Sequence, residues 1–86
     1  MNQGILFPDL MEWQAVEQRV RFPAQQMGAL IDCYISQRRL ERMTGLVLTR
    51  EDDIVRAFES VRFDIEELAE KLIEEQAFAE DGAIYL

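Results

Sequence analysis

Three glutamates, Glu66, Glu70 and Glu74, recur at every fourth position of an acidic segment, so a helix would place them on one face. Carboxylate oxygens are the ligands that divalent cations such as Mg²⁺ and Ca²⁺ prefer. Helical metal sites of this kind usually add histidine in a Glu-x-x-His pattern, and the sequence contains no histidine. We therefore interpret the glutamates as a solvated helix face and predict neither a metal ion nor another cofactor.

Nucleophilic catalysis is also difficult to build from this sequence. Cys33 is its one cysteine, and without histidine it has no partner to act as a general base. It lies on the apolar side of an alternating segment, where a thiol is usually an inert part of the core. The four glycines are isolated from one another and form no phosphate-binding loop. We predict that the protein is not an enzyme.

The arginines are the main candidates for binding an anion or an acidic group. Eight of the nine basic residues are arginine, and Arg38, Arg39 and Arg42 form a local basic cluster. A guanidinium group makes planar, bidentate contacts with carboxylates and suits fixed ion pairs better than lysine does. The cluster is a candidate surface for an anion or an acidic partner.

Two further residues are candidates for binding. Arg62 lies in the middle of the acidic segment, where it can pair with Glu59 or Glu66 on its own helix or bind an external anion. Trp13 can pack on the edge of the core or anchor a partner, because tryptophan is enriched at interaction hot spots.

Hydrophobic periodicity predicts the strands that position these residues. Residues 5–7, 19–22, 29–36 and 83–86 indicate strands, Pro23 and Gly28 bracket a loop, and residues 10–18 fit either a strand or a helical turn. Within 29–36 the uniformly apolar face is the expected core face. Leu30 and Tyr34 fall on the opposite face, where an apolar patch would indicate a protein partner or a homodimer.

Two helices follow. Ser36 is a suitable N-cap and Gly45 a C-terminal stop for a short helix, and Thr49 with Asp52 resembles a capping box for a second one. The second helix continues to residue 77 with apolar residues every three or four positions, a length of about 42 Å. A domain of this size is only about 30 Å across. The helix must therefore bend gently near residues 60–63 or extend onto a second subunit.

Length and charge bound the class of protein. The 86 residues predict one domain, 1–86, with 49% hydrophobic and 30% charged residues. Residues 51–86 carry a net charge of −9 and residues 1–50 a net charge of +1, so we expect no binding to duplex nucleic acid. No apolar run is long enough to cross a bilayer, the first residues do not resemble a signal peptide, and the single cysteine fits a reducing compartment. We expect a cytoplasmic protein that does not bind membranes.

A set of short motifs resembles one bacterial family. It comprises Val-Arg-Phe-Pro-Ala at 20–24, Gly28, Cys-Tyr-Ile-Ser at 33–36, Leu40, Ala-Phe at 57–58, Arg62, Ile-Glu at 65–66 and Ala69. Their order and spacing are similar to those of the family called domain of unknown function 1488. The resemblance implies a cytoplasmic α+β domain from a Gram-negative bacterium and supplies no catalytic residues. The apolar connector at 46–48 departs from the family pattern.

These observations together predict an α+β fold, with an antiparallel sheet of three to five strands and one short and one long helix on one face, in the order βββααβ. The expected function is a non-catalytic protein-interaction or regulatory module that uses the outer sheet face or the arginine cluster. The alternative is a protein that binds a small ligand or an anion in a pocket between the sheet and the long helix, with Arg62 taking part.

Overall fold

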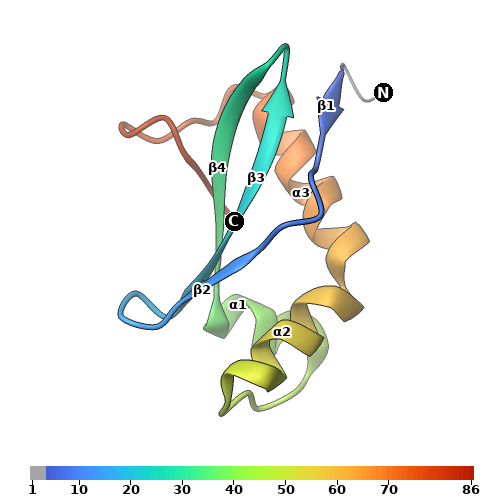
Figure 1. Ribbon diagram of the computed structural model, residues 1–86, viewed down its shortest axis with the longest axis vertical. Helices are drawn as coiled ribbons and strands as arrows, with labels where there is room; N and C mark the ends of the chain where they lie inside the picture. Colours follow the sequence, from blue (N-terminus) through green and yellow to red (C-terminus); the bar gives the residue numbers. More distant parts are fainter. Residues whose placement is uncertain (1–3) are drawn as a thin grey trace.

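Two long antiparallel strands form the centre of the structure, a computed structural model that describes residues 4–86. β3 (Arg19–Gln26) and β4 (Ala29–Ser36) pair along their whole length. Three short strands complete the sheet. β1 (Ile5–Leu6) and β2 (Glu12–Gln14) both pair with β3 (Figure 1), and β5 (Ile84–Tyr85) pairs with β4. The segment 10–18, which the sequence left undecided, thus contains a strand followed by a turn.

Three helices lie on one side of this sheet (Figure 1). They are α1 (Gln37–Thr44), which follows β4 directly, α2 (Glu51–Ser60) and α3 (Arg62–Glu74). Side chains from both layers form one core, in which the rings of Phe22 and Phe58 lie 5.4 Å apart. The predicted α+β architecture is confirmed, and its full order is ββββαααβ.

The sheet is mixed, because β5 runs parallel to β4, whereas the sequence pattern predicted an antiparallel sheet. Ile84 pairs with Cys33 and Tyr85 with Tyr34. A parallel neighbour requires a crossover connection, and the three helices between β4 and β5 provide it. β5 therefore lies at one edge of the sheet, in the order β1-β3-β4-β5.

Pro23 lies inside β3 and not in the loop predicted after Phe22. Its neighbour in β4 is Asp32, but on the other side of β3 it falls between the residues that pair with β2 and those that pair with β1. At that position the strand has an open edge among the described residues. Proline is tolerated at such an edge, where no ladder hydrogen bond is lost.

The long helix predicted to continue to residue 77 is divided at Val61 into α2 and α3, inside the region 60–63 where a gentle bend was expected. The Ser60 hydroxyl donates to the Ala57 carbonyl at 2.7 Å and competes with the helical hydrogen bond to that oxygen. Val61 N–H is shared between the carbonyls of Ala57 and Phe58, at 3.3 Å each. The break keeps both helices on a domain that measures 36 × 25 × 20 Å.

The caps of α1 are those predicted. Ser36 accepts a hydrogen bond from Arg39 N–H at 3.0 Å, and Gly45 ends the helix with a left-handed φ of 74°. The start of α2 is one residue later than predicted: Arg50 is the N-cap, and its N–H donates to the carboxylate of Asp53 at 3.2 Å. The side chain at the third helical position caps the backbone, and this position is Asp53 because the helix begins at Glu51.

Candidate functional site

The three arginines predicted as a cluster all lie on α1. Arg38 and Arg42 are exposed and Arg39 is half-buried. Among residues 4–86 no carboxylate lies within 4.0 Å of any of the three guanidinium groups. The one acid on α1, Glu41, instead accepts a hydrogen bond from Leu48 N–H at 2.9 Å. Within the described part of the chain, none of the three guanidinium groups therefore forms a direct ion pair with a carboxylate.

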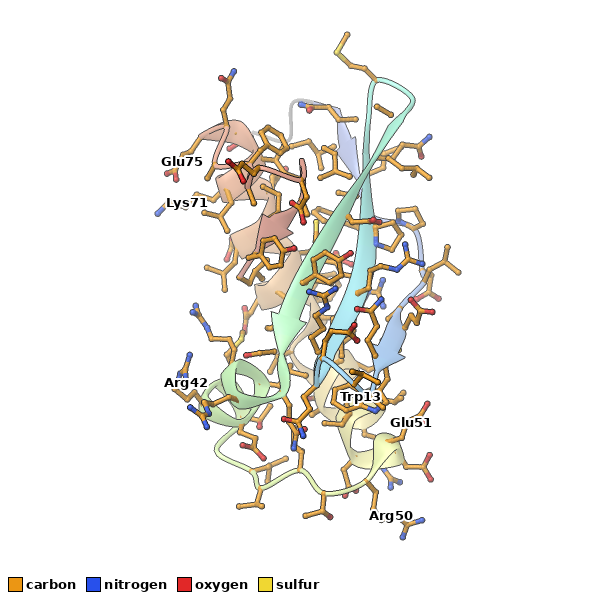
Figure 2. All side chains as sticks on the ribbon, turned by 90° about the vertical axis from the view of Figure 1, so that its left-hand side faces the viewer. Trp13, Arg42, Arg50, Glu51, Lys71 and Glu75 are labelled. Carbon is orange, nitrogen blue, oxygen red and sulfur yellow. The ribbon has the colours of Figure 1, made fainter. Side chains whose placement is uncertain are left out.

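An apolar groove lies beside this cluster, between α1, α3 and the edge strand β5. Its volume is about 360 Å³. Its floor is formed by Leu68 and Leu72 of α3 together with Leu86, and the ring of Tyr85 lies alongside. Three charged side chains border the groove, namely Arg39, Lys71 and Glu75. Figure 2 shows Lys71 and Glu75 near one end of the molecule and Arg42 lower on the same side.

The packing of α3 explains why leucines line this groove. The apolar seam of this segment runs through Ile65, Leu68 and Leu72, and Ala69 and Ile73 widen it on one side. The structure buries Ile65, Ala69 and Ile73 and leaves both leucines partly exposed. Spacing alone could not distinguish the two stripes, because both have helical periodicity. α3 therefore presents an apolar edge to solvent next to β5.

Arg62 is held by the protein's own groups. Its side chain is only 13% exposed, and it pairs with Glu66 at 2.8 Å, Glu59 at 3.2 Å and Asp9 at 3.5 Å. Its Nη2 also donates to the backbone carbonyls of Pro8 at 2.9 Å and Leu10 at 3.3 Å. All three nitrogens are engaged, so the residue connects α3 to the segment between β1 and β2 and offers little to an external anion.

Leu30 and Tyr34 lie on the outer face of the sheet but do not form one apolar patch. Asp32 lies between them on that face, and its carboxylate pairs with Arg21 at 3.0 Å. Tyr34 is half-buried, with the guanidinium group of Arg19 3.8 Å from its ring centre. Leu30 is 70% exposed near the β3–β4 turn, where Leu6 and Met27 are also exposed.

Tyr34 also stacks on Tyr85 of β5, with ring centres 5.1 Å apart. The Tyr85 hydroxyl donates to the Asp81 carboxylate at 2.6 Å. This hydrogen bond lowers the pKa of Asp81 and raises the pKa of Tyr85. The outer face at Tyr34 is thus a polar and aromatic network that fixes β5 to β4.

Trp13 belongs to β2, opposite Val20, and is partly buried against the core. Figure 2 shows it well apart from Arg42, so it does not contribute to the α1 surface. The candidate residues therefore divide into separate places, and only the α1 arginines are brought together.

The cysteine and the acidic clusters of the described residues offer no further candidate site. Burial raises the pKa of Cys33 to about 12, so its thiolate is not available at neutral pH. Within the described residues no cluster of three or more histidine, cysteine, aspartate or glutamate side chains could hold a metal ion. Glu66, one of the three spaced glutamates, is engaged by Arg62.

Comparison with known proteins decides the family. The family model described as "Protein of unknown function (DUF1488)" matches residues 5–86. The chain belongs to the DUF1488 family. This confirms the resemblance seen in the sequence motifs.

The names of two relatives and of one solved structure similar to this DUF1488 domain assign no activity. The chain is 39% identical to the uncharacterized protein YrdB of Escherichia coli K12 and 38% identical to that of Shigella flexneri, in each case over 100% of this chain and 99% of the relative. A crystal structure of a DUF1488 protein of unknown function from Shewanella loihica PV-4 has a TM-score of 0.95 and 43% identity, and it covers 100% of this chain and 94% of that one. The relatives support the fold and assign no activity.

Two features of the DUF1488 domain were missed in the sequence. Lys71 and Tyr85 border the groove, yet nothing in their local sequence sets them apart, because the groove exists only once β5 lies beside α3.

In the part of the chain that the structure describes, no helix combines the length and apolar character needed to cross a membrane.

Proposed function

We propose that this DUF1488 domain is a non-catalytic protein-interaction module, and that its partner binds the basic surface of α1 formed by Arg38, Arg39 and Arg42. The observation that carries the proposal is the lack of a carboxylate within 4.0 Å of these three guanidinium groups among residues 4–86. The same chain has 17 acidic residues, and Arg21 and Arg62 each pair with at least two of them.

Unpaired arginines on a short, well-capped helix suit recognition of carboxylates. A guanidinium group loses less side-chain entropy per hydrogen bond than an ammonium group and can bind a carboxylate through two parallel bonds. Complementary charge also raises the rate of association and selects the partner. The expected partner is therefore a protein with an acidic surface.

A non-catalytic role is supported by the chemistry of the side chains. The chain has no histidine, and the pKa of Cys33 is raised to about 12. The net charge of −8 is unfavourable for duplex nucleic acid, because like charges repel over about one Debye length. We place the protein in the cytoplasm, where its single buried cysteine would remain reduced.

The test compares two charge-reversal variants. Affinity capture from a bacterial lysate with in situ cross-linking identifies proteins bound to the wild-type chain, and each one is then purified and titrated against both variants. Arg38→Glu/Arg42→Glu is expected to weaken the complex by about tenfold or more. The matched control, Arg50→Glu/Arg56→Glu, makes the same charge change on α2 and is expected to leave the affinity within about twofold.

The proposal also predicts salt dependence, since the contacts are between exposed charges. Affinity for the wild-type chain should fall as salt rises from 50 to 500 mM, and affinity for the α1 variant should change little. If every purified partner binds both variants equally, the α1 surface is not the binding site and the proposal is wrong.

A further inference from the structure

The groove beside α1 has the features of a site for an extended peptide. β5 is an edge strand, and the described residues place no further strand on its outer side. Leu86 N–H donates to the Tyr34 carbonyl at 2.9 Å, so the backbone N–H and C=O of the preceding residue, Tyr85, point away from β4 toward the open edge. Just before β5 the Ala83 carbonyl accepts a hydrogen bond from Ala79 N–H at 2.8 Å, so the open edge begins at Tyr85. Backbone groups at such an edge can pair with an added strand.

The apolar floor gives an added strand a place for a side chain. Leu68, Leu72 and Leu86 are partly exposed around a volume of about 360 Å³. Side chains of a strand alternate between its two faces, so one or two apolar side chains of an added strand can enter the groove while their neighbours face solvent.

The border of the groove selects the charge of the occupant. Arg39 and Lys71 lie on it with one acid, Glu75, and Arg38 and Arg42 continue the positive surface along α1. On the lining itself two cations face one acid, and charges beyond about 8 Å are screened at physiological salt. Charge complementarity therefore favours a carboxylate-bearing occupant.

We propose that an extended, acidic segment of a protein partner pairs with the edge of β5, inserts an apolar side chain between Leu68, Leu72 and Leu86, and contacts Arg39 and Lys71 with its carboxylates. This inference rests on the proposed function and names the mode of binding. Arg39 belongs to both the α1 surface and the groove, so one partner can cover the two together.

The test uses three capped synthetic hexapeptides, of alternating glutamate and leucine, glutamate and serine, and lysine and leucine. Each is titrated to 2 mM into ¹⁵N-labelled protein at 150 mM salt, and amide shifts are followed. Only the glutamate–leucine peptide is expected to bind, with the largest shifts at Tyr85 and Leu86. Equal binding of the serine peptide or of the lysine peptide would overturn the proposal, as would shifts confined to other parts of the domain.

Three exposed substitutions locate the contacts without touching the core. Lys71→Glu is expected to weaken the glutamate–leucine peptide by at least fivefold, and Glu75→Gln to tighten it about twofold because a repulsive carboxylate is removed. Arg50→Glu changes the N-cap of α2, at the opposite end of the molecule from Lys71 (Figure 2), by the same charge as Lys71→Glu and should have no effect. A response of all three variants in proportion to net charge alone would overturn the proposal.

Other occupants give distinct results. Binding of octanoate with no binding of any hexapeptide would assign the groove to a small amphiphilic anion and overturn the peptide proposal. Broadening of the Tyr85 amide with protein concentration alone, with a dimer in sedimentation equilibrium, would assign the edge to a second copy and overturn it as well. The proposed function is tested by the affinity of purified protein partners for Arg38→Glu/Arg42→Glu, and the groove is tested by the hexapeptides. A failure of peptide binding alone therefore leaves the proposed function standing.

Discussion

The guanidinium group of Arg62 donates a hydrogen bond to the carbonyl of Pro8 at 2.9 Å, across 54 positions of the chain. This contact joins the first turn of α3 to the segment that connects β1 with β2. It also explains why a residue that resembles a ligand-binding arginine in the sequence has a structural role. The acidic partners expected on the same helix, Glu59 and Glu66, are present and complete the coordination of the side chain.

Removal of this connection should destabilise the domain. Arg62→Ala leaves the carbonyls of Pro8 and Leu10 without their charged donor, and we expect a loss of about 2 kcal/mol in the free energy of unfolding. Arg62→Lys keeps the charge but cannot make all the contacts, so its free energy of unfolding should lie between those of the wild type and Arg62→Ala. Urea unfolding followed by circular dichroism measures the change, with Arg56→Ala as the control. Arg56 is 79% exposed and pairs only at 3.8 Å, so its loss should cost under about 0.5 kcal/mol. Equal stability of the Arg62→Ala and Arg56→Ala proteins would disprove the structural role.

The Glu12–Arg21 pair should make stability depend on pH in the acid range. The hydrogen bond from Arg21 lowers the pKa of Glu12 below its usual 4.5 in the folded state. A lowered pKa stabilises the folded protein above the unfolded value and loses this effect as pH falls through the folded value. Glu12→Gln should therefore lower Tm at pH 7, and its difference from wild type should shrink as pH falls from 4.5 to 3. A difference that is constant from pH 7 to 3 would show that the charge is not responsible.

Cys33 should be unreactive while the protein is folded. Its side chain is fully buried and its pKa is raised to about 12, so almost no thiolate is present or accessible at pH 8. We expect no reaction with a disulfide-based thiol reagent over an hour in buffer, and complete reaction within minutes in 6 M guanidinium chloride. The raised pKa also means that the thiol favours folding below about pH 9, and that this contribution is lost as pH rises toward 12. Fast labelling under native conditions would contradict the burial.

The C-terminal cap of α1 gives a prediction on backbone conformation. Gly45 has φ of 74°, and a Cβ there would meet no atom within 4 Å, so a substitution acts through conformation and not through a clash. Gly45→Ala should lower the free energy of unfolding by about 1 kcal/mol, because the left-handed region is unfavourable for alanine. Gly45→Asn should cost less, since asparagine tolerates this region. Chemical denaturation of the three proteins gives the ranking, and an unchanged Gly45→Ala protein would refute the role of the cap.

Local patterns were enough to predict a good part of this fold. Alternation in β4 correctly placed Cys33 and Ile35 on the core face, and both are fully buried. Ser36 and Gly45 correctly marked the ends of α1. Each of these features depends on neighbours within a few residues, through pleating or through capping hydrogen bonds, so the sequence carries the whole signal.

Most features that the sequence could not supply involve distant segments. The length of the helix predicted a bend near residues 60–63, but the apolar spacing continues through this region and did not show that the helix ends at Val61. The parallel direction of β5 follows from the crossover of three helices, and no residue in 83–86 encodes it. Periodicity shows that a strand or helix has an apolar face but not what covers that face, because burial is set by the packing of both partners.

The arginine cluster and the groove show this division at the candidate site. The sequence determined that Arg38, Arg39 and Arg42 lie together, because a capped helix fixes residues three and four positions apart on neighbouring faces. Whether a groove lay beside them depended on α3 and β5, whose groove residues Lys71 and Tyr85 lie 29 or more positions further along the chain than Arg42. Tertiary packing brings these groups together, because an open edge, an apolar floor and a charged border arise only where α1, α3 and β5 meet.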